Sequence, residues 1–150
     1  MNTNVLRLIF LLISIALWVT SLFLPAVWKG TAPLDFGDYG LFTLVIGWAE
    51  AAYGEKVGPF VAFAWFANPL IVMALILDSV NSKVESKGAM ILASIAALLC
   101  VGYILFGQVA VLDESGNANP VQTFTPGSAF WAASSLTTLM RTLMPPNSRI

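Results

Sequence analysis

The sequence predicts an all-α membrane protein: a bundle of four transmembrane helices with a structured first extracytoplasmic loop. The first observation behind this is that all fifteen charged residues lie outside four long windows. These windows are Leu8–Trp28, Val57–Leu77, Gly88–Leu112 and Ser115–Met140. A helix needs roughly 20 apolar residues to cross a hydrocarbon core of about 30 Å, and a charge at its centre costs about 2.5–3.5 kcal/mol.

Composition is the second observation. Hydrophobic residues make up 58% of the 150 residues and charged residues 10%, whereas soluble domains are about 25% charged. Residues 1–150 are expected to form one domain, with spans at about 6–27, 58–79, 88–110 and 126–144. The first span could instead be a signal peptide, but its apolar run exceeds the usual length of about 7–15 residues and no Ala-x-Ala cleavage site follows it.

The third observation is the distribution of charge between the two sides. With the amino terminus inside, the inner segments carry five basic and two acidic residues, and the outer loops carry two basic and six acidic ones. The inner residues are Arg7, Lys83, Lys87, Arg141 and Arg149, with Asp78 and Glu85. The positive-inside rule therefore places both termini in the cytoplasm. Arg141, at the end of the fourth span, is expected to extend to the inner headgroups.

The first outer loop, residues 29–56, is too long to be a plain turn and contains five glycines. Within it, Leu41, Leu44, Val45 and Trp48 recur at the spacing of one helical face. This run is too short to span, so it predicts an interfacial or re-entrant helix, and a β-hairpin over residues 41–53 is the alternative. Acidic residues at 35, 38 and 50 disfavour a fifth crossing.

The second span contains Trp65 followed by Asn68 and Pro69. Pro69 lacks an amide hydrogen and clashes with the carbonyl of Trp65, which predicts a kink or a helix start. An unpaired carboxamide in hydrocarbon costs several kcal/mol, so Asn68 is expected to face the bundle and bond a neighbouring group. Two roles stay open for Asn68: a structural contact between helices, or a substrate or ion contact at a broken helix.

The last two spans carry packing signals. Ala89, Ala93 and Ala97 form a stripe of small residues that lets another helix approach closely. In the fourth span, Thr125 is expected to cap a helix that begins at Pro126. Its serines and threonines, among them Ser134 and Thr138, are expected to pack against other helices or a partner chain.

Few residues suggest chemistry. The chain has no histidine and one cysteine, Cys100, expected to pack in the core. No nucleophile triad, glycine-rich phosphate loop or basic nucleic-acid patch is present, so we expect no enzyme activity, no cofactor, no metal and no nucleic-acid partner. An outer calcium site is disfavoured because the acidic spacing matches no known loop. Glu50, between Trp48 and Tyr53, could be partly buried and handle protons.

The stretch from Leu24-Pro25-Ala26 through Gly40-Leu41-Phe42, Gly47-Trp48 and Trp65-Phe66-Ala67-Asn68-Pro69 resembles uncharacterised small bacterial four-helix membrane proteins. The resemblance covers roughly the first half of the chain. It implies a multi-pass protein of the bacterial inner membrane and no particular activity. The layout of inside termini and a larger first outer loop is also similar to that of the claudin group, but both claudin cysteines are missing, which limits that similarity to layout.

The sequence therefore predicts a non-enzymatic accessory or assembly subunit of a larger membrane complex, in contact with lipids and with other subunits or copies of itself. The expected recognition surfaces are the Ala89/Ala93/Ala97 stripe and the Ser/Thr face of the fourth span. The alternative is a small transporter, channel-like or lipid-binding protein with an outward pocket near Glu50, Trp65, Asn68 and Pro69.

Overall fold

The computed structural model describes residues 3–26, 39–46, 63–80, 83–106, 111–112, 118–119 and 123–145. Four long helices dominate this part of the chain, namely α1 (Thr3–Leu22), α5 (Ala67–Val80), α6 (Lys83–Phe106) and α7 (Pro126–Leu143). A short helix, α2 (Gly40–Ile46), and a two-residue antiparallel ladder between β1 (Val111–Leu112) and β2 (Ala118–Asn119) complete the described elements. The prediction of an all-helical chain with four long helices is confirmed.

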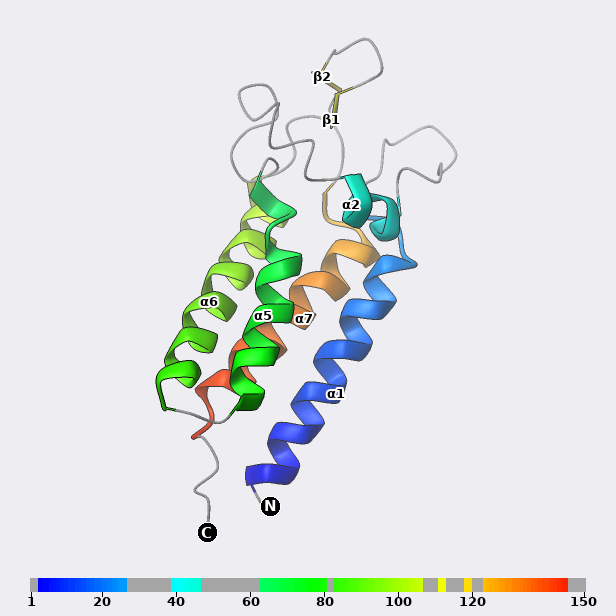
Figure 1. Cartoon of the computed structure of the whole chain (residues 1–150). Helices are drawn as coiled ribbons and strands as arrows, with labels where there is room; N and C mark the ends of the chain where they lie inside the picture. Colours follow the sequence, from blue (N-terminus) through cyan, green and yellow to red (C-terminus); the bar gives the residue numbers. More distant parts are fainter. Residues whose placement is uncertain are drawn as a thin grey trace.

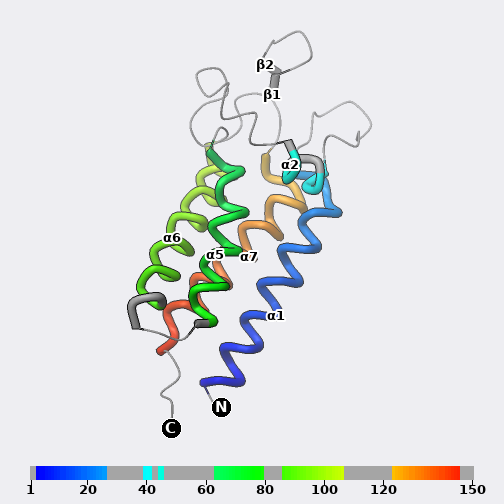
Figure 2. The backbone as a smooth tube through the Cα atoms, in the orientation of Figure 1, coloured from blue at the N-terminus to red at the C-terminus, as the bar shows by residue number. Residues whose placement is uncertain are grey.

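Helix α7 holds the bundle together. It packs along α1 on one side and along α6 on another, with a shorter contact to α5, while α5 and α6 pack as a pair. Helix α1 has no extensive contact with α5 or α6. The start of α1 and the end of α7 lie at one end of the bundle, and α2 lies at the opposite end (Figures 1 and 2). Groups near residues 7, 78 and 141 therefore meet at the terminal end.

The membrane prediction is supported in part. In the part of the chain that the structure describes, two helical segments are long and apolar enough to cross a membrane, Thr3–Leu22 and Ser86–Phe106. The apolar segment of α5, Ala67–Ser79, is shorter. Helix α7 has 18 residues but is less apolar than the other three long helices, because serines and threonines are frequent in it.

Proline residues lie at the end of α1 and at the start of α5. Helix α1 ends at Leu22, short of residue 27, because the amides of Phe23 and Leu24 turn back to the preceding carbonyls and Pro25 follows. Helix α5 begins at Ala67, after helical residues at 63–64 and a turn at 65–66, so the helical run is interrupted close to Pro69, where a kink or a helix start was predicted; residues 58–62 lie outside the described residues. The carbonyl of Trp65, which Pro69 cannot bond, accepts instead from the amide of Asn68 at 3.1 Å and from its side chain at 3.3 Å.

Helix α6 starts earlier than predicted, and helix α7 starts at the predicted residue. Helix α6 starts at Lys83, before the predicted residue 88, so basic residues assigned to a loop lie in its first turns. Helix α7 starts at Pro126 as predicted, with Thr125 as its cap. The Thr125 hydroxyl accepts from the Ser128 amide at 3.2 Å, and the Ser128 hydroxyl accepts from the Thr125 amide at 2.9 Å. This reciprocal capping box satisfies two amides that the first turn leaves free.

Two structures were considered for the first outer loop, a short helix and a β-hairpin. Over residues 40–46 the chain forms the helix α2. The rest of that loop, with Trp48, Glu50 and Tyr53, lies outside the described residues. Gly40 starts α2 against the end of α1: its amide donates to the Leu24 carbonyl at 3.1 Å, and a Cβ atom at Gly40 would collide with the Ser21 carbonyl. Only glycine allows this close approach.

Candidate functional site

Apolar side chains cover the outside of the bundle, and polar ones fill much of its interior. Large apolar residues are exposed on all four long helices, for example Leu12, Ile76, Leu98 and Leu143, each more than half exposed. Among the described residues, thirteen polar or charged ones are buried, and every one of them forms a hydrogen bond within the chain. Soluble proteins seldom combine many buried polar residues with large exposed apolar surfaces.

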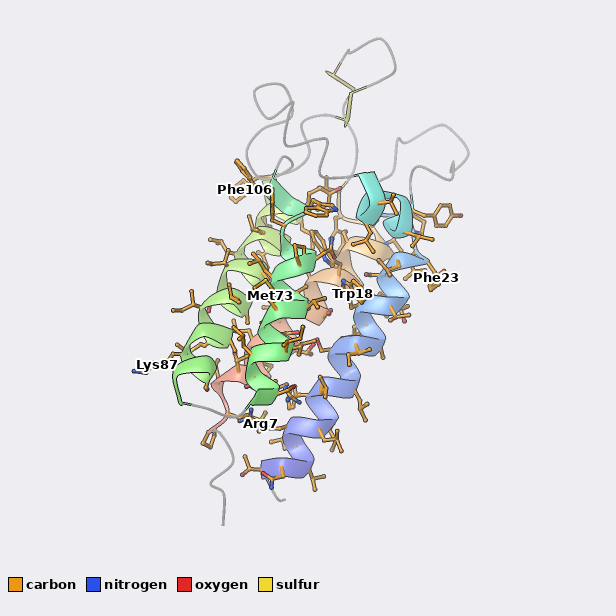
Figure 3. All side chains as sticks on the ribbon, viewed as in Figure 1. Arg7, Trp18, Phe23, Met73, Lys87 and Phe106 are labelled. Carbon is orange, nitrogen blue, oxygen red and sulfur yellow. The ribbon has the colours of Figure 1, made fainter. Side chains whose placement is uncertain are left out.

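Three of the four charged side chains that the structure describes meet at the terminal end of the bundle. Asp78 of α5 accepts from Nη2 of Arg7 on Oδ1 at 2.8 Å and from Nε of Arg141 on Oδ2 at 2.6 Å. The carboxylate is fully buried, and the two guanidinium side chains are 6% and 8% exposed. The fourth, Lys87, is exposed on α6, and Figure 3 shows it pointing away from the bundle. We call Arg7, Asp78 and Arg141 the charge cluster.

Backbone carbonyls complete the charge cluster. Arg7 donates to the carbonyls of Met144 and Pro145 at 3.3 and 3.0 Å and to that of Asp78 at 3.3 Å. These carbonyls lie at the C-terminal ends of α7 and α5, where helix dipoles place negative partial charge. Arg141 also donates to the Arg7 carbonyl at 2.7 Å. One carboxylate and two helix ends therefore oppose two guanidinium charges, which makes the cluster a structural clamp between three helices.

A hydroxyl layer lies further along α1 and α7. The Ser14 hydroxyl donates to the Ser134 carbonyl at 3.1 Å, and the Ser134 hydroxyl donates to the Ser14 carbonyl at 3.0 Å. The hydroxyls of Ser14 and Thr138 are also hydrogen-bonded to one another. All three residues are fully buried. Small side chains at this crossing allow the two backbones to approach and to exchange hydrogen bonds directly.

Asn68 joins three helices nearer the other end of the bundle. Its carboxamide oxygen accepts from the indole nitrogens of Trp18 on α1 and Trp131 on α7, both at 3.0 Å. Its amide group donates to the Trp65 carbonyl, and Trp65 in turn donates to the Leu44 carbonyl of α2 at 2.7 Å. Both lone pairs of the Asn68 oxygen are thus occupied by protein donors. This geometry matches the structural role considered for Asn68.

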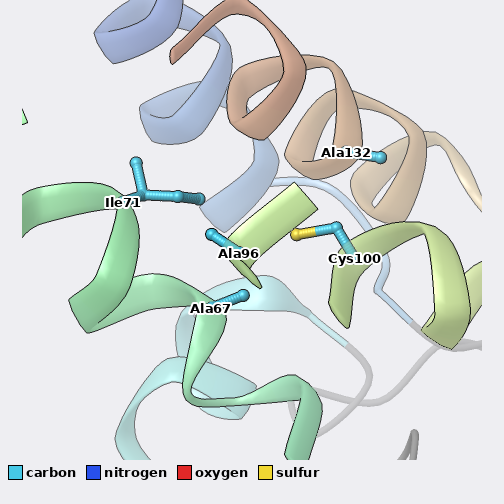
Figure 4. Packing of buried hydrophobic residues seen from close by; sticks show 5 residues of the cluster. All are labelled: Ala67, Ile71, Ala96, Cys100 and Ala132. Atoms are coloured by element: carbon cyan, nitrogen blue, oxygen red, sulfur yellow. The ribbon is translucent and has the colours of Figure 1, made fainter. Parts of the chain in front are cut away.

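The apolar core between α5, α6 and α7 is made of small residues. Ala67 and Ile71 of α5, Ala96 and Cys100 of α6 and Ala132 of α7 form one buried cluster (Figure 4). The alanine stripe of α6 belongs to the same interior: Ala89 and Ala93 are fully buried and Ala97 is 6% exposed. The helices that approach this stripe are the chain's own, because α6 packs against α5 and α7.

A seven-residue spacing underlies the α1–α7 contact. On α1 the buried residues are Arg7, Ser14 and Ser21, and on α7 the same spacing relates Gly127, Ser134 and Arg141. The helices run in opposite directions, so Arg7 meets Arg141 and Ser14 meets Ser134. Seven residues are close to two helical turns. Residues at this spacing therefore lie on the same face of each helix, the face that contacts the other helix.

Gly127 fixes the other end of this contact. Its amide donates to the Pro25 carbonyl at 3.0 Å. A Cβ atom at this position would lie 2.8 Å from the Leu24 carbonyl oxygen and still closer to that of Pro25. Any side chain would therefore push the first turn of α7 away from the turn that follows α1.

The structure gives each predicted site residue a place, except Glu50, which lies outside the described residues. Trp65, Asn68 and Pro69 lie together at the start of α5. Ser134 and Thr138 face α1 within the chain. The expectation that Arg141 extends to the headgroups is wrong, because Asp78 and the Arg7 carbonyl hold it inside the bundle. The same cluster holds Arg7 and Asp78, which the charge distribution assigned to the inner segments, in the interior of the bundle.

The charge cluster and the Trp18–Asn68–Trp131 junction were not predicted. The seven-residue recurrence of polar residues in the first and fourth spans was the available signal for the cluster. No local pattern indicates which indole pairs with Asn68. Among the described residues, no group of three metal-ligating side chains comes together.

Fold and site together define a class: an all-helical bundle with an apolar exterior, a hydrogen-bonded polar interior and two helices that could cross a membrane. Comparison of the chain with protein-family models, with curated proteins and with solved structures finds no match.

Proposed function

We propose that this chain is a multi-pass protein of the bacterial inner membrane, with both termini in the cytoplasm, that acts as a non-enzymatic accessory or assembly subunit of a larger membrane complex. The observation that supports this proposal is the distribution of polarity: each described buried polar residue is bonded within the chain, and large apolar side chains are exposed on every long helix. Lipid tails would satisfy that exterior, and no described buried group is left over for a substrate.

The length of α7 and its polar residues fit this proposal if α7 crosses as a shielded helix. Six of its eight buried residues are polar or charged. Several of them bond to carbonyls of α7 itself, such as Ser135 to Ala132 and Thr142 to Leu139. Contacts with α1, α6 and α5 cover the rest. A central helix can therefore be more polar than the peripheral helices that face lipid.

The proposed partner surface differs from the one that the sequence suggested. The alanine stripe and the Ser134/Thr138 face are both buried in contacts between helices of this chain. Other subunits, or further copies of the chain, would meet the outward faces. The outward face of α1 is one such surface, because only three of its 20 residues are buried and α7 is its main neighbour.

The alternative, a transporter, channel-like or lipid-binding protein with a pocket near Glu50 and Asn68, has less support from the described geometry. A substrate-binding carboxamide needs a free oxygen or amide in a cavity. The Asn68 oxygen is occupied by Trp18 and Trp131, and the residue is 8% exposed. The accessory role therefore remains our proposal.

Native mass spectrometry of the tagged chain, extracted in mild detergent from its own membrane, tests the proposal. Reproducible foreign subunits, absent from a mock extraction with the tag alone, are the expected result. A chain that carries a defined small molecule and no partner would favour the pocket alternative. Release of the chain from membranes by alkaline carbonate would contradict membrane integration itself.

A further inference from the structure

The charge cluster joins residues that lie far apart along the chain. Arg7 lies in the second turn of α1, Asp78 near the end of α5 and Arg141 in the last turn of α7. They are separated by 71 residues and 63 residues of chain, yet both pairs are direct salt bridges. The cluster can form only when α1 runs in one direction and both α5 and α7 run in the other.

Helix α7 needs such a contact more than α1 or α6 does. By length and composition, α1 and most of α6 could cross a membrane. Helix α7 does not meet this criterion. Its buried face bears hydroxyls and Arg141, and these groups find partners on α1 and α5. Hydropathy alone is therefore a weak determinant of whether α7 crosses.

We propose that the charge cluster is a topology checkpoint: it selects the bundle in which α1, α5 and α7 have all inserted in their native orientations, and thereby fixes the side on which the C-terminus lies. This inference rests on the proposed membrane location. A chain with α7 left outside or reversed keeps Arg7 and Asp78 at the inner end but lacks Arg141, and the guanidinium of Arg141 is left without its carboxylate.

The positive-inside rule offers a competing explanation for the side on which the C-terminus lies, and three substitutions separate the two explanations. Lys87→Gln and Arg141→Gln each remove one basic residue from the inner side, but only Arg141 belongs to the cluster. Asp78→Asn removes no basic residue, and acidic residues contribute little to orientation by that rule. A charge count therefore predicts that Asp78→Asn has no effect, whereas the checkpoint predicts that it disturbs topology.

The experiment uses the full-length chain with one of two reporters after Ile150: alkaline phosphatase, active only outside, or a fluorescent protein, bright only inside. Both are normalised to pulse-labelled chain in the membrane fraction. The expected results are an inside C-terminus for the wild type, Lys87→Gln and Asp78→Glu, and a rise of at least several-fold in the outside signal for Asp78→Asn and Arg141→Gln.

Pulse labelling keeps the test decisive if a variant is degraded later, because orientation is measured on newly made chains. An inside C-terminus for Asp78→Asn, whether or not it is then degraded, would overturn the checkpoint and leave only a stabilising clamp. Equal scrambling by Lys87→Gln and Arg141→Gln would also overturn it in favour of a charge count. A wild-type chain that is soluble or has its C-terminus outside would instead contradict the proposed membrane topology.

Discussion

Ser14 and Ser134 exchange hydrogen bonds across the α1–α7 contact, each hydroxyl donating to the other residue's carbonyl, at 3.1 and 3.0 Å. Both residues are fully buried. The exchange requires the two backbones to lie close together, so it determines the register of α1 against α7 as well as their distance. The Arg141 donor bond to the Arg7 carbonyl, seven residues away on each helix, continues that register.

Substitution of Ser14 is expected to loosen α1. Ser14→Leu should lower the free energy of unfolding by about 1–3 kcal/mol, the usual cost of overpacking a tight contact. Ser14→Ala should cost only about 0.6 kcal/mol, the average of hydrogen bonds between membrane helices. Denaturation in detergent micelles, followed by tryptophan fluorescence, measures both. Ser94→Leu is the control, since Ser94 is exposed on α6 and bonds only to its own helix, at the Met90 carbonyl.

Loss of the Asn68 carboxamide should destabilise the junction of α1, α5 and α7. Asn68→Ala leaves the indole N–H groups of Trp18 and Trp131 without their acceptor. Each buried unsatisfied donor costs about 1–3 kcal/mol. The same unfolding measurement should show this loss, while Ser79→Ala, at an exposed position on α5, should be neutral. Unchanged stability together with loss of a binding or transport activity would instead support the pocket alternative.

Two glycines allow a matched comparison. Gly127→Ala places a methyl group against the Leu24 and Pro25 carbonyls, whereas at Gly88 the nearest atom to a new Cβ is a Leu77 methyl at 3.6 Å. Gly127→Ala is expected to cost about 1–3 kcal/mol. Gly88→Ala should be neutral or stabilising by up to about 1 kcal/mol, because alanine favours helix. Thermal unfolding measures which of the two variants is less stable. Equal stability of the two would contradict the close approach at Gly127.

The alanine stripe is expected to behave as core. Ala93→Leu should lower the free energy of unfolding by about 1–3 kcal/mol, because Ala93 is fully buried where α6 packs in the bundle. The conservative control Ile95→Leu, at a position 43% exposed on the same helix, should be within about 0.5 kcal/mol of the wild type. If Ala93→Leu kept its stability and lost only a partner subunit, the stripe would face outward after all.

The sequence alone predicted features that local physics determines. The charge-free windows located the four long helices, Pro69 predicted the start of α5, and Thr125 with Pro126 predicted the start of α7. The spacing of Leu41, Leu44 and Val45 predicted the helical turn of α2. Hydropathy, capping and the geometry of proline act within a few residues along the chain, so one sequence is sufficient to recognise them.

Only the tertiary structure decided what the polar residues do. Arg141 was expected at the headgroups and Ser134 against a helix of unknown origin, yet Asp78 and Ser14 are their partners. These partners are 63 and 120 residues away in the chain. Hydropathy predicts that a buried polar group needs a partner, but the packing of α1 and α5 around α7 chooses which one, because pairing depends on distance in space and is not encoded by local spacing.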